Sequence, residues 1–197
     1  MKLLLTLLLT SLLTTQLFAF KDTFFIGAYM GTGTGENRSD LSGGLSTLDQ
    51  TSEITGFHMG GEFRFERYRN FKGRWELSYD NRVMTVEDAS GTEYESKGYR
   101  AGAAYSWGYA LDTMLNDEIV PFFKLGYGIS KMDGGLEKGY DTLLGLGVYY
   151  ITQYVEVGLG IDQEGRNYEG WRFNPEWFGH TRETNLLPYV TVNIRLY

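Results

Sequence analysis

From about residue 24 onward, the chain divides into eight extended segments, and apolar and polar residues alternate along seven of them. The first segment, residues 24–30, is apolar on both faces, so its register stays open. The clearest segment is 57–66, where Phe57, Met59 and other residues at odd positions are mostly apolar, while Glu62, Arg64 and other residues at even positions are mostly polar. A period of two places successive side chains on opposite faces of a β-strand. The pattern therefore predicts an all-β fold of eight strands.

The connections between these segments alternate in length. Four are long and polar, at about residues 35–53, 87–96, 131–139 and 165–183. Three are shorter, at about residues 68–72, 110–118 and 152–154. One end of the fold is therefore expected to carry long loops, and the other end to carry turns together with both chain ends. No stretch has the composition of a linker, so we expect a single domain.

The two faces of segments two to eight differ in charge. The apolar face, which includes Trp75 and Trp107, carries no Asp, Glu, Lys or Arg. The opposite face carries six basic and seven acidic residues: Arg64, Arg74, Arg82, Arg100, Lys124, Arg195, Glu62, Glu66, Glu76, Asp80, Asp141, Glu156 and Asp162.

This asymmetry decides which face meets solvent. A soluble barrel would have to hold all of the aromatic rings in the narrow interior of eight strands, which lacks the volume. With the apolar face turned outward to lipid, the rings have room and the charges fill the lumen. An outward Arg or Lys at mid-bilayer would cost roughly 2–4 kcal/mol, which explains why that face is uncharged. We predict an eight-stranded antiparallel up-and-down transmembrane β-barrel.

Composition supports this fold and excludes several classes of protein. The 197 residues include 26 Gly, 15 Tyr and 12 Phe but only 3 Pro, a mixture that favours strands. The chain has no Cys, so disulfide scaffolds and thiolate metal sites are excluded. Its net charge of −7 argues against a nucleic-acid partner, because phosphate contacts need a basic face.

The first 19 residues do not share the alternating pattern. Lys2 is followed by an apolar run from Leu3 to Leu13 and, later, by the small residue Ala19. This order is typical of a secretory signal peptide. A membrane anchor helix is the alternative, although the run is shorter than the ~20 apolar residues that a span needs. We expect residues 1–19 to be removed and residues 20–197 to form the barrel domain.

Several strands resemble those of a known family. In the stretch 120–128, a proline is followed by two aromatic residues, and the stretch ends in Gly-x-Gly. The predicted strands around 146–148 and 157–160 are similarly rich in glycine. These features resemble the OmpA/OmpX-type small outer-membrane β-barrels of Gram-negative bacteria. The resemblance implies residence in the bacterial outer membrane, contact with lipids and lipopolysaccharide, and insertion by the outer-membrane assembly machinery.

The last residue departs from the pattern that the resemblance implies. That family usually ends on an aromatic residue in phase with the apolar row of the last strand. Here Tyr197 is in phase with Arg195 and Asn193 instead. Either the last residue bends out of register, or its recognition by the assembly machinery is atypical.

The inward charges allow two interpretations. They either form a salt-bridged plug that satisfies itself, or they line a narrow water-filled path whose charges tune ion passage. Six inward glycines leave room beside them: Gly126, Gly128, Gly145, Gly147, Gly158 and Gly160. Arg64, Arg82 and Arg100 are candidates to fill that room, and a small pocket is the other outcome. We expect no wide pore in either case.

The sequence offers little support for catalysis or for a cofactor. The chain has two histidines, and we interpret His58 as a hydrogen-bonded filler of the lumen and His180 as a surface residue. Lipid A-modifying barrels use a histidine with a serine and an acid, and no such pattern carries over. We expect no enzyme, no metal and no cofactor.

The last long connection is unusually aromatic. Four of its residues are candidates either for binding a partner or a sugar or for lying on the headgroup layer: Trp171, Phe173, Trp177 and Phe178. The predicted role is structural and surface-interactive, covering membrane integrity and adhesion or recognition through the loops. A narrow gated channel is the second hypothesis, and a lipid-modifying enzyme is the third.

Overall fold

The computed structural model describes residues 23–41, 44–65, 68–87, 91–113, 117–133, 139–168 and 181–197. These residues form eight long strands and one strand of two residues. In chain order they are β1 (Thr23–Leu41), β2 (Gly44–Phe65), β3 (Tyr68–Glu87), β4 (Glu93–Tyr109), β5 (Leu111–Asp112), β6 (Glu118–Met132), β7 (Gly139–Ile151), β8 (Val155–Tyr168) and β9 (Thr181–Leu196). The predicted signal peptide lies outside the described residues. None of the described segments is a helix long and apolar enough to cross a membrane.

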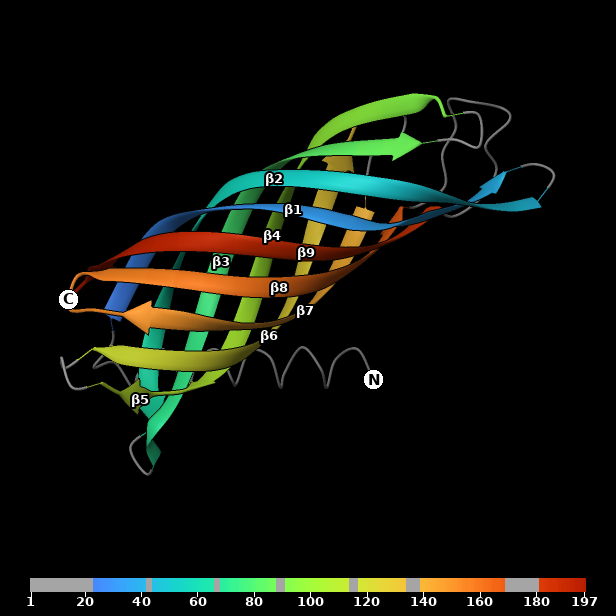
Figure 1. Cartoon of the computed structure of the whole chain (residues 1–197). Coiled ribbons are helices and arrows are strands. Elements are labelled where there is room, and N and C mark those ends of the chain that lie inside the picture. The colour runs from blue at the N-terminus through green and yellow to red at the C-terminus, as the bar shows by residue number, and fades with distance from the viewer. Residues whose placement is uncertain are drawn as a thin grey trace, which may run out of the picture.

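The strands close into an antiparallel barrel (Figure 1). Long strands that follow one another in the chain are paired, and β1 pairs with β9. β4 pairs directly with β6, because the short β5 that comes between them in the chain pairs only with the start of β6. Phe24 at the start of β1 lies opposite Leu196 at the end of β9, so the start of the first strand and the end of the last strand lie at the same end of the barrel. We call this the turn end and the opposite end the loop end. The predicted eight-stranded barrel is confirmed.

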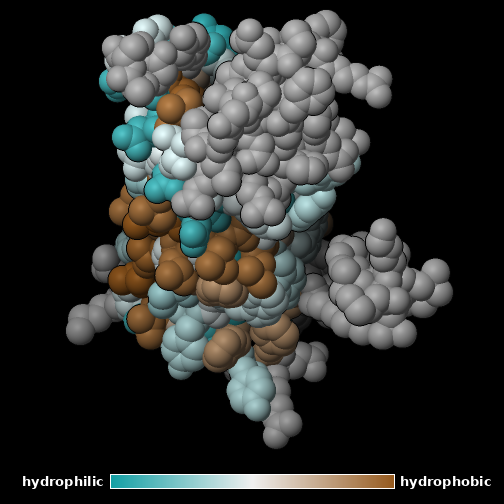
Figure 2. Space-filling model, turned by 90° about the vertical axis from the view of Figure 1, so that its right-hand side faces the viewer, coloured by the Kyte–Doolittle hydropathy of each residue, from teal (hydrophilic) through white to brown (hydrophobic). Residues whose placement is uncertain are grey.

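An apolar band surrounds the barrel wall. Outward side chains such as Ile26, Leu146 and Val192 are exposed although they are large and apolar. Figure 2 shows such residues as a continuous brown patch on one face. Aromatic rings pack against one another on the outer surface near the turn end, for example Tyr105 on Trp107 at 4.5 Å between ring centroids. Such a surface suits contact with lipid, where exposed charges would be costly.

The structure shows which side chains of the first strand face the lumen. Both faces of residues 24–30 are apolar in the sequence, yet Phe24, Ile26 and Met30 are exposed while Phe25 is buried. Tyr29 also faces the lumen, where its hydroxyl donates a hydrogen bond of 2.7 Å to Asp80. β1 therefore keeps the same alternation as the other strands, with aromatic rather than charged residues inside.

The strands are longer than predicted. The expected loop 35–53 is instead a continuation of β1 to Leu41 and of β2 from Gly44, paired residue by residue. The expected turn 68–72 lies within β3, which begins at Tyr68 after a register shift between Arg64 and Phe65. Exposed and buried residues alternate over residues 49–53, and at both places neighbouring strands supply backbone partners that keep the chain extended.

The structure also places Asn81 and Tyr197, two residues that do not fit the alternation of their strands. Asn81, the polar residue on the outward face, causes no bulge, since the pairings with β2 and β4 run through it without a shift. It lies opposite Thr55 and Tyr99, toward the loop end of the wall. Tyr197 follows the end of β9 and is 78% exposed, so it leaves the inward row of Arg195 and Asn193.

Candidate functional site

The charged residues of the strands are buried inside the barrel. Among the described residues, seven basic side chains are buried, namely Lys72, Arg74, Arg82, Arg100, Lys124, Arg166 and Arg195. Eight acidic side chains are buried with them, namely Glu62, Glu76, Asp80, Asp141, Glu156, Asp162, Glu164 and Glu183. Each of the fifteen has an oppositely charged partner within 4.0 Å.

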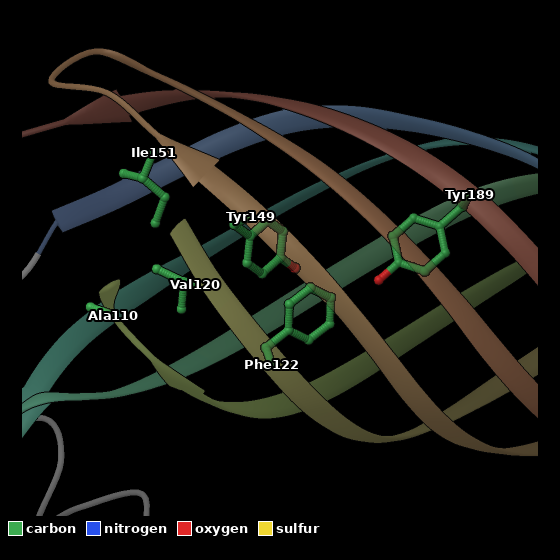
Figure 3. Close-up of a cluster of buried hydrophobic side chains, with 6 residues drawn as sticks. All are labelled: Ala110, Val120, Phe122, Tyr149, Ile151 and Tyr189. Carbon is green, nitrogen blue, oxygen red and sulfur yellow. The ribbon is translucent and has the colours of Figure 1, made fainter. Parts of the chain in front are cut away.

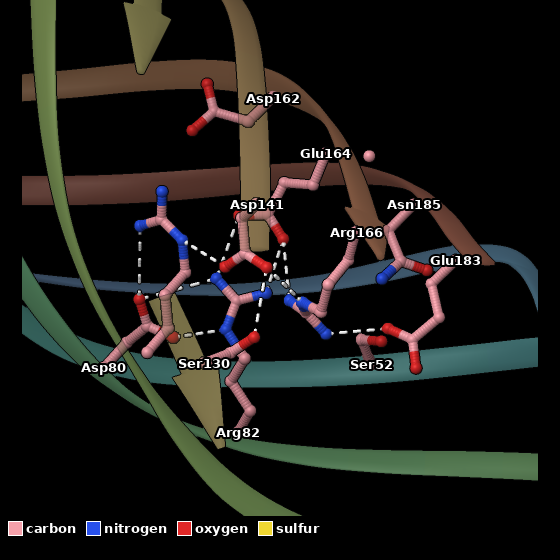
Figure 4. Close-up of polar contacts among 12 residues, drawn as sticks. Ser52, Asp80, Arg82, Ser130, Asp141, Asp162, Glu164, Arg166, Glu183 and Asn185 are labelled. Atoms are coloured by element: carbon pink, nitrogen blue, oxygen red, sulfur yellow. Dashed lines mark hydrogen bonds and ion pairs between the residues drawn. The ribbon is translucent and has the colours of Figure 1, made fainter. Parts of the chain in front are cut away.

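One group of ion pairs fills the lumen toward the loop end (Figure 4). Arg82 pairs with Asp80 beside it on β3 and with Glu164 on β8. Asp141 on β7 accepts hydrogen bonds from Arg100 at 2.9 Å and from Arg166 at 2.7 Å. These guanidinium groups share carboxylates, which leaves no single pair isolated. The arrangement is a network that spans five strands, because Glu183 on β9 also pairs with Arg166 at 2.7 Å.

A second group fills the turn end. Arg74 on β3 pairs with Glu156 on β8, and its guanidinium lies 3.5 Å from the centroid of the Phe25 ring. Arg195 on β9 reaches both Glu156 at 3.6 Å and Glu62 at 3.3 Å. Lys72 completes the group by binding Glu62 at 2.6 Å.

A small cavity lies between the two groups. Its lining includes Arg82 of the loop-end group, Glu76, which lies 4.0 Å from Arg74 of the turn-end group, and the ion pair of Lys124 and Asp162, which meet at 2.7 Å. Its volume of about 20 Å³ is room for about one water molecule. A cavity of this size is too small to hold a hydrated ion.

Aromatic rings occupy the space beside three of the six inward glycines. Figure 3 shows Phe122 and Tyr149 face to face, with ring centroids 4.3 Å apart, and Tyr189 beside them. A Cβ atom at Gly147, Gly158 or Gly160 would lie within 2.6 Å of one of these three rings. Of the three arginines expected there, only Arg100 lies against these glycines, over Gly128. Flat rings fit closely over glycine backbone, which is why they displace the longer side chains.

Most of the predicted lumen residues lie together, with two exceptions. Arg64 was expected inside, but its side chain is 47% exposed, and it pairs with Glu118. Arg64 lies directly opposite Lys72 and so faces the same side of the wall, but it lies at the turn-end rim, where its partner Glu118 also binds Lys72. Glu66 lies outside the described residues, as do His180 and the loop aromatics Trp171, Phe173, Trp177 and Phe178.

Sequence reasoning missed several inward charges. Glu164, Arg166 and Glu183 join the loop-end group, and Lys72 joins the turn-end group. The signal was present for β8, because Asp162, Glu164 and Arg166 continue the period of two beyond the last apolar residue. It was overlooked because the outward residues between them are not apolar.

One contact chain resembles a hydrolytic triad. His58 Nδ1 lies 3.0 Å from Glu76 and its Nε2 lies 2.9 Å from the Thr191 hydroxyl. Thr191, however, is 1% exposed and does not line the cavity. A substrate therefore has no route to this hydroxyl through the described structure. Among all the residues that the structure describes, no group of His, Asp and Glu is arranged to hold a metal ion.

Comparisons with known proteins agree with the fold. No protein-family model matches the chain, and no curated protein sequence matches it. Among solved structures, the outer membrane protein OprG from Pseudomonas aeruginosa is similar, with a TM-score of 0.52 and 12% identity over 89% of this chain and 96% of OprG.

A weaker match is the outer membrane protease OmpT from Escherichia coli, with a TM-score of 0.43 and 8% identity over 91% of this chain and 98% of OmpT. At these identities, likeness shows the fold alone. The chain has the fold of an outer-membrane β-barrel.

Proposed function

We propose that this protein is a bacterial outer-membrane barrel with a structural role and a closed lumen, which holds its loop end at the cell surface for recognition or adhesion. The uncharged outer band supports residence in a membrane, with lipids and lipopolysaccharide as its surroundings and the outer-membrane assembly machinery as its route of insertion. The fold shared with OprG supports the same location.

The observation that carries the structural role is the pairing of every buried charge. A conducting path needs charges that face water, whereas all fifteen buried charged side chains of the described strands have a partner of opposite sign. Ion-paired buried networks rigidify a core, although four buried polar atoms of this one, on Arg74, Asp162 and Arg195, have no hydrogen-bond partner. The lumen therefore acts as a core, and the exposed ends of the strands and the loops are left for interaction.

Single-channel recording in planar bilayers tests the closed lumen. The purified protein should give no discrete conductance steps, with a general porin as positive control for insertion. Arg82→Ala and Arg100→Ala should stay equally silent or lose fold. Steps in the unmodified protein that change in size with Arg100→Ala would contradict the structural role.

A narrow gated channel is the second candidate. The cavity favours it, because charged side chains line it, among them Arg82 and the ion pair of Lys124 and Asp162. Small conductance steps would support this candidate. A lipid-modifying activity is the third candidate, and mass spectrometry of lipid A from cells with and without the protein tests it, since altered acyl chains would reveal catalysis.

A further inference from the structure

The ring of His58 lies at the centre of the lumen and contacts three groups through its two nitrogens. The residue is 3% exposed. Nδ1 lies 3.0 Å from a carboxylate oxygen of Glu76 on β3. Nε2 lies 2.5 Å from the side-chain oxygen of Asn193 and 2.9 Å from the hydroxyl of Thr191, both on β9. The proton positions on this ring follow from what each partner is able to donate.

Asn193 presents its oxygen to the ring, because its nitrogen is committed elsewhere. Nδ2 donates a hydrogen bond to the Glu156 carboxylate on β8. Turning the amide over would set its oxygen against that carboxylate, which has no proton to give. The Asn193 oxygen is an acceptor only, so His58 Nε2 must carry a proton to bind it.

Thr191 does not change this assignment. Its single proton has two other acceptors, the Ala28 carbonyl and the Asn193 oxygen, each at 3.1 Å. If Thr191 donated to His58 Nε2 instead, the 2.5 Å contact between Nε2 and Asn193 would join two acceptors. On the opposite side of the ring, Nδ1 faces the Glu76 carboxylate, which also pairs with the Arg74 guanidinium at 4.0 Å. A carboxylate ionised by such a pair only accepts, so Nδ1 must also donate.

We propose that His58 carries a proton on both ring nitrogens at neutral pH and serves as a fixed positive charge of the lumen. A free histidine is mostly neutral under these conditions. Among the buried side chains of the described strands, seven basic residues face eight acidic ones, and a charged His58 makes the numbers equal. The ring then ties β2 to β3 and β9 by charge-assisted hydrogen bonds, which are the stronger kind.

The surroundings of the ring are compatible with a cation. Aromatic rings from β1 lie next to it, Phe25 at 5.6 Å and Tyr29 at 5.3 Å between centroids, and such rings attract positive charge. The other positive groups nearby are Arg74, 4.0 Å from Glu76, and Lys124, Arg82 and Arg100, which line the same cavity. The carboxylates of Asp80, Asp162 and Glu164 line this cavity too. Glu156 offsets them through Asn193.

Nuclear magnetic resonance of the folded protein tests the charge directly. The variant His180→Gln, labelled with 15N-histidine and placed in lipid nanodiscs, contains His58 as its one histidine. Both ring nitrogens of His58 should show the chemical shift of a protonated nitrogen at neutral pH. One ring nitrogen with the shift of an unprotonated nitrogen would overturn the proposal.

A second test uses two substitutions that should change the urea midpoint of unfolding in opposite directions. Glu76→Gln should lower the urea midpoint of unfolding, because it leaves the charge on His58 without its carboxylate. Adding His58→Gln to Glu76→Gln should then raise the midpoint again. If the double variant unfolds at a lower urea concentration than Glu76→Gln alone, His58 contributes only a neutral hydrogen bond and the proposal fails.

Discussion

Arg82 in β3 reaches across the lumen and donates hydrogen bonds through both terminal nitrogens to the carboxylate of Glu164 in β8. In the ring of eight long strands, β3 and β8 lie opposite each other. Arg74 and Glu156 join the same two strands nearer the turn end. These two pairs therefore brace opposite walls of the barrel at two levels, and neither could form if the strands paired in a different register.

Breaking the first brace should be costly. Arg82→Met leaves Glu164 and Asp80 buried with fewer partners, and loss of one member of a buried pair costs about 3–5 kcal/mol. Urea unfolding in detergent micelles measures the loss. The matched control is Lys97→Met, because Lys97 pairs with Glu95 at 2.8 Å on the exposed surface, where a pair contributes about 0–1 kcal/mol. Equal losses in the two variants would contradict a bracing role for Arg82.

The outer band should reject charge in a position-dependent way. Leu146 is 62% exposed in the middle of the outward row of β7. Leu146→Arg should lower the free energy of unfolding in lipid vesicles by about 2–4 kcal/mol, as for a cation at the bilayer midplane. Thr142→Arg, on the same row nearer the loop end, should cost about 0–1 kcal/mol. A tolerated Leu146→Arg would remove the case for a lipid-facing band.

The aromatic rings that lie over inward glycines leave no room for a side chain at those positions. A Cβ atom at Gly160 would lie 2.5 Å from Tyr189, whose hydroxyl is held by Lys124 at 3.0 Å. Gly160→Ala should therefore destabilise the barrel by about 1–3 kcal/mol, as overpacking does. Gly165→Ala on the same strand is the control, because its Cβ would meet only the Thr142 hydroxyl at 3.3 Å. Thermal unfolding in detergent should separate the two.

A row of acidic residues crosses the loop end of the barrel. Glu36, Asp49, Glu87 and Glu93 lie opposite one another on β1 to β4, and all four are exposed. Like charges directly opposite each other are destabilising, so Asp49→Lys should stabilise the fold by about 0.2–1 kcal/mol for each neighbouring strand. The gain should shrink at high salt. Thr51→Lys, between Thr34 and Thr85, should give a smaller gain.

Local sequence was sufficient for the fold class and for the sorting of side chains. The alternation that separates Leu146 from Gly145, or Val192 from Asn193, is a property of any extended chain, since neighbouring side chains point to opposite sides. The charge-free face then identified the outside without any knowledge of how the strands pair. Even β1, where both faces are apolar, follows the alternation of its neighbours once it is paired with them.

Partners across the lumen were beyond the reach of the sequence. Which carboxylate Arg82 meets, or that Asn193 turns its oxygen to His58, depends on how far each strand is shifted against the next around the closed barrel. Closure also decides that Arg64 lies exposed at the rim, whereas Lys72, directly opposite it, is buried. Alternation fixes only the side of the wall on which a residue lies, whereas closure of the barrel fixes its height and its neighbours, and both are needed to turn a row of charges into a paired core.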